Sequence, residues 1–284
     1  MKSFLFSTAL CLFVFLATNA QESSLLWRIS GNGLSEPSYI YGTIHLICPQ
    51  DYSMKSKVKA CFAETQQVYL EVDFDDPQMM QKMMSMSMLT NGETARDYLT
   101  DEEYAYLDDK FKNTIGTGMA QLQVMKPLIL LSMSYISILQ CQPVSFETVF
   151  VEMAKEEDKE VLGLESLEQQ MSFFNEIPLT EQFKMVSDIV KQEDKARDEF
   201  NTLVKIYNSE NIKGLLEFMD ESEWSMEKYE EILIHGRNKD WASKLDSIAK
   251  EKPTFFAVGA GHLAGENGWL SLLEKKGYNV EAVK

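Results

Sequence analysis

The sequence of 284 residues carries 44 acidic and 27 basic residues, which give a net charge of -17 at pH 7. Such an acidic surface repels phosphate backbones, so the composition argues against a nucleic-acid partner. With 45% hydrophobic and 11% aromatic residues, the chain can build the core of one large domain and does not have the composition of a disordered protein.

The first 20 residues predict a secretory signal peptide. Lys2 supplies the positive end, Phe4 to Ala17 form an apolar run, and Thr18-Asn19-Ala20 fits a cleavage site. The alternative is an uncleaved membrane anchor, but the apolar run is short for a bilayer span. No later stretch predicts a transmembrane segment. We therefore expect an exported protein, periplasmic or secreted, in which residues 21–284 form a single domain; the sequence does not predict an oligomeric state.

Strand-like segments lie in the two ends of the exported part. Leu25–Ser30 and Ser38–Gly42 flank a loop rich in Gly, Asn and Pro, which predicts a hairpin. Alternating or continuous apolar patterns predict further strands at Val68–Phe74, Val161–Leu164, Thr254–Val258 and Asn279–Val283. A helix is expected between the last two strands, over Asn267–Lys276.

The middle of the chain predicts helices. A capping box at Thr100–Glu103 opens one helix, Thr180 opens another, and the apolar segment Pro127–Leu139 predicts a buried one. Others are expected at residues 199–208, 212–219 and 225–233. The fold class is therefore mixed α/β, with a central β-sheet built from the N- and C-terminal parts and a large helical insertion over roughly residues 77–155 and 167–235.

Three cysteines follow the predicted signal peptide: Cys48, Cys61 and Cys141. In an oxidising compartment this odd number predicts one disulfide and one free thiol. The spacing leaves the pairing open.

The chain has three histidines, and two of them share one local pattern. His45 closes Gly42-Thr43-Ile44-His45 after one predicted strand, and His262 closes Gly259-Ala260-Gly261-His262 after another. Open α/β sheets bind ligands at the carboxyl ends of their strands, and imidazole is the commonest transition-metal ligand. The pair therefore predicts a shared metal site, although a histidine beside a strand can also be structural.

Glu71 is the candidate for a third metal ligand, because it interrupts an apolar predicted strand and a buried carboxylate needs a partner. Asp73 would lie on the same face, as a supporting group for the ligands. The alternative is that Glu71 is an exposed strand residue.

Several ordered segments resemble the TraB/GumN (TraB/PrgY/GumN) family, to which the Tiki metalloproteases also belong. The resemblance covers nearly the whole exported part, and its segments are Leu26–Gly31, Ser38–Leu46, Tyr69–Asp73, Gly163–Ser166 with Gln170, Arg237-Asn238 and Phe256–Gly265. It implies an erythromycin-esterase-like fold and a hydrolase that depends on a divalent ion (Mn, Co or Zn).

By the same resemblance, His45, Glu71 and His262 are the implied metal ligands. Glu71 would be a ligand or a general base, and Arg237 would hold a substrate carboxylate or an oxyanion, or form a structural ion pair. The remaining implied site residues are Gly42, Glu165, Asn238 and Gly259; Glu165 would orient a ligand histidine or pair with Arg237. Glu147 departs from the family pattern, because many members have Asp early in the helix that precedes the Gly-Leu-Glu strand.

Two other features have simpler explanations. His235, beside Gly236, is expected to end a helix and to interact with its C-terminal charge. The methionines between Met79 and Met88 suit Cu(I) in principle, but their helical spacing favours core packing or a flexible substrate-facing helix.

The sequence therefore predicts an exported metal-dependent hydrolase acting on a peptide or amide bond, with a peptide or protein as substrate. The first alternative is a protein that binds or sequesters a peptide signal without cleaving it. The second is a structural envelope protein whose histidine turns only pack.

Overall fold

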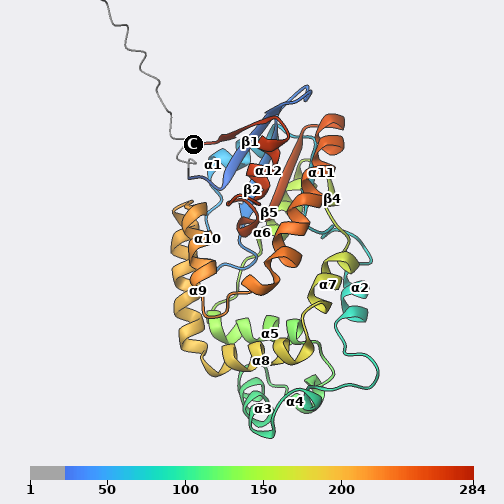
Figure 1. Ribbon diagram of the computed structural model, residues 1–284, viewed down its shortest axis with the longest axis vertical. Coiled ribbons are helices and arrows are strands. Elements are labelled where there is room, and N and C mark those ends of the chain that lie inside the picture. The colour runs from blue at the N-terminus through green and yellow to red at the C-terminus, as the bar shows by residue number, and fades with distance from the viewer. Residues whose placement is uncertain (1–22) are drawn as a thin grey trace, which may run out of the picture.

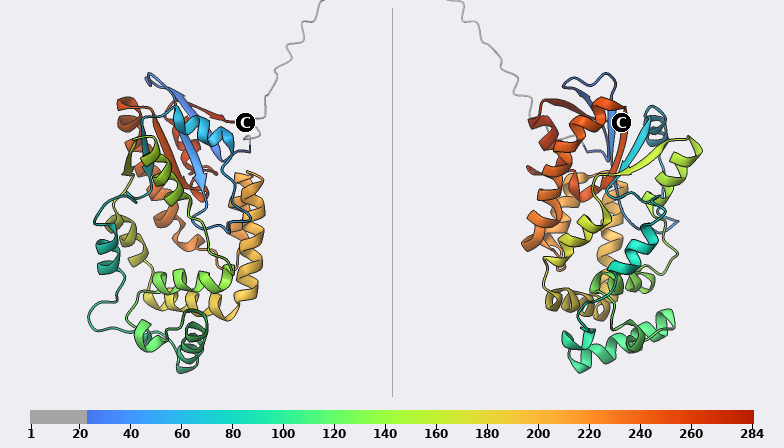
Figure 2. Two further views of the ribbon diagram at one scale, coloured as in Figure 1. Left: turned by 180° about the vertical axis from the view of Figure 1, so that it is seen from behind. Right: turned by 90° about the vertical axis from the view of Figure 1, so that its right-hand side faces the viewer.

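The computed structural model describes residues 23–284, and the predicted signal peptide lies outside them. Six strands form one mixed sheet in the order β4-β3-β5-β2-β1-β6. Helices α11 and α12 cover one face of the sheet, and α1 and α6 cover the other (Figure 2). The strands are β1 Leu26–Gly31, β2 Ser38–Thr43, β3 Gln67–Leu70, β4 Glu160–Gly163, β5 Thr254–Gly259 and β6 Tyr278–Ala282.

Strand direction places four strand ends at one edge of the sheet. β1 and β2 form the predicted antiparallel hairpin, and β6 pairs antiparallel with β1. β2, β5, β3 and β4 run parallel to one another. Their carboxyl ends therefore meet at the same edge, which is where ligands bind in sheets of this kind.

Helices fill the connections from β3 to β4 and from β4 to β5. The end of the molecule farthest from the sheet is formed by α3 and α4, and α5 and α8 lie between them and the sheet (Figure 1). The predicted mixed α/β fold with a central sheet and a helical insertion is confirmed. The helices are α1 Ser56–Ala63, α2 Met79–Met86, α3 Asp101–Ile115, α4 Met119–Leu122, α5 Pro127–Leu139, α6 Phe146–Glu156, α7 Leu167–Asn175, α8 Leu179–Lys191, α9 Glu193–Asn208, α10 Ile212–Glu221, α11 Gly236–Glu251 and α12 Trp269–Lys275.

The helical end has a hydrophobic core of its own. One core surrounds the sheet and includes Trp241 and Trp269, which are fully buried. A second core joins α3, α4, α5 and α8, with Phe111 and Phe183 at its centre. Between residues 23 and 284, no helix is both long enough and apolar enough to cross a bilayer.

Three local predictions were wrong. β3 ends at Leu70 rather than Phe74, because the Gly259 N–H that faces the strand end donates to the Glu71 side chain, so the pairing with β5 stops there. Pro178 rather than Thr180 precedes the first residue of α8. The helix expected over residues 225–233 is a 3-10 turn at Glu227–Tyr229 followed by a π-helix at Glu231–His235.

The predicted disulfide joins Cys48 to Cys141, and Cys61 is free and buried. Cys48 lies in the segment after β2, and Cys141 lies between α5 and α6. An isolated β-bridge between Ile47 and Val144 holds the same two segments together. The disulfide therefore ties the segment that carries His45 to the start of α6.

Replacing Cys48 and Cys141 by serine should lower the free energy of unfolding by about 2–4 kcal/mol, because the disulfide closes a long loop in the unfolded chain. Denaturant unfolding of the double variant beside wild type measures this. Replacing Cys61 by serine is the control for loss of a thiol without loss of a crosslink. Equal midpoints for the double variant and wild type would contradict the prediction.

Candidate functional site

Four polar side chains meet at the carboxyl edge of the parallel strands. His45 follows β2, Glu71 follows β3 directly, Glu165 follows β4, and His262 lies in the 3-10 turn Ala260–His262 after β5. The structure thus brings both Gly-x-x-His segments to neighbouring strand ends, as predicted. Glu71, Glu165 and His262 are buried, whereas the His45 side chain is 68% exposed.

Glycine at position 42 allows the turn after β5 to approach β2. A Cβ atom at Gly42 would lie 2.7 Å from Leu263 Cδ1 and 3.1 Å from Ala260 Cα. The first contact is too short for a methyl group, and the second would require the Ala260 backbone to move by a few tenths of an ångström. Gly42 therefore acts through packing, and it sets the distance between the two histidine segments.

Gly259 leaves a space that the three predicted metal ligands surround. A Cβ atom there would lie 3.2 Å from Glu71 Oε1, 3.6 Å from His262 Cδ2 and 3.8 Å from His45 Nε2. Side chains from three separate parts of the chain therefore border one small volume, which we call the Gly259 cradle.

His262 is held as a neutral imidazole. The Asn238 amide nitrogen donates to the carbonyl oxygens of His262 and Asn267, at 3.2 and 2.9 Å. Its oxygen therefore faces His262 Nδ1 at 2.7 Å, and Nδ1 must carry the proton. Burial lowers the pKa of His262 to about 3. The ring packs on Trp241, with 4.5 Å between ring centroids.

His45 is held in a similar way by Glu147, a residue of the first turn of α6. His45 Nδ1 lies 2.9 Å from Glu147 Oε1, which also accepts from Thr43 Oγ1 at 3.3 Å. Ser145 Oγ donates to the other oxygen of Glu147 at 2.7 Å. The hydrogen bond to Glu147 raises the pKa of His45 to about 9. Both histidines therefore have Nδ1 bonded to a side-chain oxygen.

Glu71 is an ionised carboxylate with a complete set of partners. Oε1 accepts from the Gly259 N–H at 2.8 Å, and Oε2 accepts from Gln170 Nε2 at 3.1 Å and from Arg237 Nη2 at 2.6 Å. Burial acts to raise the pKa of Glu71, but the His262, Arg237 and His45 side chains and the Gly259 N–H outweigh it and lower the pKa to about 2.

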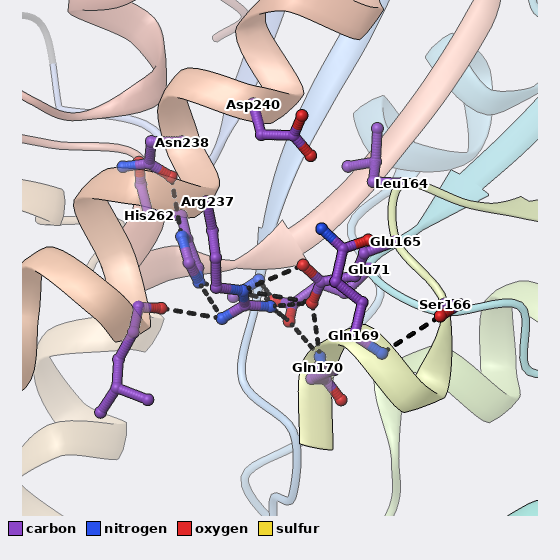
Figure 3. A network of polar contacts seen from close by, with 12 residues as sticks. Glu71, Leu164, Glu165, Ser166, Gln169, Gln170, Arg237, Asn238, Asp240 and His262 are labelled. Atoms are coloured by element: carbon purple, nitrogen blue, oxygen red, sulfur yellow. Dashed lines mark hydrogen bonds and ion pairs between the residues drawn. The ribbon is translucent and has the colours of Figure 1, made fainter. Parts of the chain in front are cut away.

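Arg237, near the start of α11, lies at the centre of this network (Figure 3). Nη2 donates to Glu71 and to Glu165 Oε1, each at 2.6 Å, and Nε donates to Glu165. Nη1 donates to the Leu233 carbonyl at 2.9 Å and lies 3.1 Å from His262 Nε2, which has its lone pair free to accept. All five N–H groups of the guanidinium are thus engaged. This is the ion pair that the sequence offered as one alternative for Arg237.

The π-helix before α11 positions this arginine. Leu233, which accepts from the Arg237 side chain, belongs to the π-helix, and the Gly236 N–H donates to the Glu231 carbonyl. A Cβ atom at Gly236 would lie 2.9 Å from that same carbonyl oxygen. Glycine therefore permits the wide turn, a feature that is frequent at functional sites.

Some predicted residues lie outside the network. Asp73 lines a different surface pocket, where it accepts a hydrogen bond from the Asp75 N–H. His235 does not end a helix, because the π-helix continues into α11; its Nε2 lies 3.1 Å from Glu230. Helix α2 carries most of the methionines between Met79 and Met88, and it has no buried residue. The prediction that this cluster packs in the core was therefore wrong.

Sequence reasoning missed Glu147 and Trp241 as parts of the site. Glu147 was noted only as a departure from a family pattern, and it reaches His45 across 102 positions of sequence. Gln170 appeared only as part of the resemblance, although it bridges Glu71 and Glu165 at 3.1 Å each. The usable signal was the Gly-Leu-Glu element, since Gln170 lies in the first two turns of the helix that follows it.

The donor set has the chemistry of a divalent-ion site, but its present spacing does not form one. Metal-binding histidines usually donate their other ring N–H to an oxygen, as His45 and His262 do here. Nevertheless, no group of three or more His, Cys, Asp or Glu side chains in the described part of the chain is spaced to hold a metal ion. Arg237 contacts both His262 Nε2 and Glu71 Oε2, so an ion bound by these atoms requires the guanidinium to move.

A cavity of about 530 Å³ opens beside the network. His45, Glu71, Arg237 and His262 line it on the side of the sheet. Helices α5, α8, α9 and α10 and the segment before α11 line the other sides, mainly with apolar side chains. A volume of this size is typical of binding sites for small ligands or short chain segments.

A family model described as the TraB/PrgY/gumN family matches residues 25–282. The chain is 23% identical to Metalloprotease TIKI2 of Danio rerio, over 91% of this chain and 61% of the relative. It is also 23% identical to Metalloprotease TIKI1 of Homo sapiens, over 92% of this chain and 62% of the relative. The chain thus spans about three fifths of the length of these relatives. No solved structure gives a significant match.

Proposed function

This chain belongs to the TraB/PrgY/gumN family, and we propose that it is an exported metal-dependent hydrolase that cleaves a peptide or amide bond. Relatives that cover most of this chain are named metalloproteases, which supports the class of reaction. The Cys48–Cys141 disulfide supports export, because disulfides persist in oxidising compartments.

The observation that carries the proposal is the arrangement around Gly259. Two imidazole rings, each with Nδ1 bonded to a side-chain oxygen, and one ionised carboxylate border a space that a single methyl group would fill. His45, Glu71 and His262 would hold the ion. When bound, a divalent ion would polarise the substrate carbonyl and lower the pKa of a bound water.

The other residues of the network would orient these groups. Asn238 and Glu147 occupy Nδ1 of each histidine, which leaves Nε2 as the nitrogen for an ion, and Gln170 holds Glu71 and Glu165 together. Because the pKa of His45 is raised to about 9, its Nε2 must lose a proton when an ion binds. Glu71, ionised at neutral pH, can serve as a ligand or take the proton of the attacking water. Arg237 would position Glu71 and His262, and it contacts substrate only after releasing one of its present partners.

A direct test is hydrolysis of a mixed peptide library by the purified protein, followed by mass spectrometry. We expect cleavage when Mn²⁺, Co²⁺ or Zn²⁺ is supplied and loss of cleavage with EDTA. Restoration by one of the three ions would identify the metal. Cleavage that continues unchanged after exhaustive chelation would contradict metal dependence.

Replacing Gly259 by alanine should abolish this hydrolysis while leaving the fold intact. The backbone at Gly259 has φ -51° and ψ 132°, which alanine adopts without strain. The added methyl group would occupy the cradle, 3.2 Å from Glu71 Oε1. Unfolding midpoints and turnover are measured together. A variant that keeps wild-type turnover would show that the reaction does not use this space.

A second candidate function is favoured by the state of Arg237. With all its donors engaged, and with His262 Nε2 and both Glu71 oxygens paired, the buried part of the network is satisfied without a metal. A protein in this state binds a peptide in the adjoining cavity without cleaving it. Stable peptide binding with no turnover under any of the three ions would support this function.

A further inference from the structure

The apolar walls and the carboxylates of the cavity beside the network indicate which kind of peptide it binds. We infer that it is a selectivity pocket for a bulky apolar side chain of a peptide, and that its outer carboxylates select a basic group on the same peptide. This inference rests on the proposed function for the position of the reacting bond, but its binding component can be tested without turnover.

The apolar wall adjoins the network without an intervening layer. A Cβ atom at Gly261, next to His262, would lie 3.2 Å from Met219 Sδ of α10. A Cβ atom at Gly265 would lie 3.1 Å from Leu216 Cδ2 of the same helix. These two glycines let α10 pack against the turn that carries His262. A peptide whose backbone lies at the network therefore has its adjacent side chain against α10.

The other walls are apolar as well. α9 contributes Phe200 and Leu203, α5 contributes Ile138, and the segment before α11 contributes Trp224 and Leu233. Filling such a surface with an apolar side chain releases water from both partners, which stabilises the complex. A serine or a charged side chain would lose its hydration there and gain little in return.

Charge around the cavity favours a cation over an anion. The lining carboxylates outside the network are Glu199, Asp220, Glu227 and Glu230. Among the described residues, no hydrogen bond or ion pair involves the side chain of Asp220 or Glu227, and both residues are exposed. The arginine of the lining, Arg237, has all its donors engaged. A basic peptide residue or a free amino terminus would thus find a partner, whereas a carboxylate would meet repulsion.

Binding is measured by fluorescence anisotropy with labelled octapeptides in a Gly-Ser background, in EDTA so that no metal-dependent turnover occurs. The peptides carry either Leu or Ser at the centre and either two Lys or two Glu beside it. We expect the Leu/Lys peptide to bind at least about tenfold more tightly than the Ser/Lys peptide, as an apolar pocket provides for a group of this size. The Leu/Glu peptide should bind more weakly than the Leu/Lys peptide, and this difference in affinity should shrink at high salt.

Two variants probe the two halves of the inference. Met219→Glu places a charge in the apolar wall at a residue that is 38% exposed, so the fold should tolerate it; it should weaken binding of the Leu/Lys peptide about tenfold or more. Met80→Glu, at a 69% exposed methionine on α2 outside the cavity, is the matched control.

Asp220→Asn with Glu227→Gln should remove most of the preference for Lys over Glu, whereas Glu217→Gln, outside the cavity on α10, should retain it.

The outcomes separate this inference from the proposed function. Peptide binding with the expected preferences but no hydrolysis would support the pocket and count against the hydrolase. Hydrolysis without preference for Leu or for Lys would overturn the pocket and leave the hydrolase standing. Tighter binding of a dodecanoyl chain than of the Leu/Lys peptide would also overturn the inference, because the occupant would then be an acyl group.

Discussion

Replacing His262 by alanine should abolish both metal binding and hydrolysis. The variant removes one imidazole from the Gly259 cradle and leaves Asn238 and Arg237 without their shared partner. Loss of a metal ligand removes several kcal/mol of transition-state stabilisation, which corresponds to a rate about a thousandfold lower. The measurements are metal content by elemental mass spectrometry, on protein purified without an affinity metal and then offered Mn²⁺, Co²⁺ and Zn²⁺, and turnover of a cleaved peptide.

His235 provides the matched control, because it is the remaining histidine of the chain and lies outside the cavity lining. His235→Ala should retain one divalent ion per chain and wild-type turnover. His45→Ala should resemble His262→Ala, although His45 is far more exposed and its loss should cost less stability. Equal metal content in wild type and His262→Ala would remove the basis for a metal site at these residues.

Much of this network could be predicted from local sequence patterns. A Gly-x-x-His segment after each of two strands is visible without a structure, and parallel pairing of β2 with β5 then makes the two histidines neighbours. Glu71 was identifiable as a carboxylate in an apolar segment, and the structure confirms that it is buried and bonded. These patterns are informative because strand ends in a parallel sheet converge by geometry.

Other parts depended on packing between distant segments. Glu147 reaches His45 because α6 packs on the sheet and because the Cys48–Cys141 disulfide and the Ile47–Val144 bridge join the two segments. The spacing of the cysteines left their pairing open. The end of β3 at Leu70 could not be predicted from alternation, since it depends on where the Gly259 N–H finds its acceptor. The cavity walls come from α5, α8, α9 and α10, whose arrangement is a property of the hydrophobic cores rather than of any motif.

Replacing Arg237 by methionine should destabilise the fold by about 3–5 kcal/mol, because it removes one partner of a buried ion pair and leaves the others uncompensated. Glu71 Oε2 and Glu165 Oε1 each lie 2.6 Å from Arg237 Nη2, so without the guanidinium two carboxylates face each other in a buried site. Adding Glu165→Gln to this variant should recover part of the loss. Denaturant unfolding of wild type, the two single variants Arg237→Met and Glu165→Gln, and the double variant completes a double-mutant cycle, which gives the coupling between the two side chains.

Arg28→Met is the matched control for loss of an arginine. Arg28 pairs with Glu281 at 3.0 Å, but both side chains are well exposed, at 41% and 61%. Exposed pairs contribute about 0–1 kcal/mol, so this variant should unfold close to wild type. Similar losses for Arg28→Met and Arg237→Met would show that the buried network does not stabilise the fold as its geometry indicates.

The same Arg237→Met variant should bind a divalent ion more tightly than wild type, although it is less stable. In wild type the guanidinium engages His262 Nε2 and Glu71 Oε2, and an ion must compete with it for both atoms. An ion that binds only the folded state adds stability that grows with the logarithm of its concentration divided by Kd, about 2.7 kcal/mol at a concentration a hundred times Kd. Metal should therefore restore more stability to Arg237→Met than it adds to wild type, in unfolding curves recorded with and without Mn²⁺ or Zn²⁺.

An equal metal effect in both proteins would mean that the ion does not use these two atoms, and Arg237 would then be a permanent member of the network rather than a competitor for the metal site.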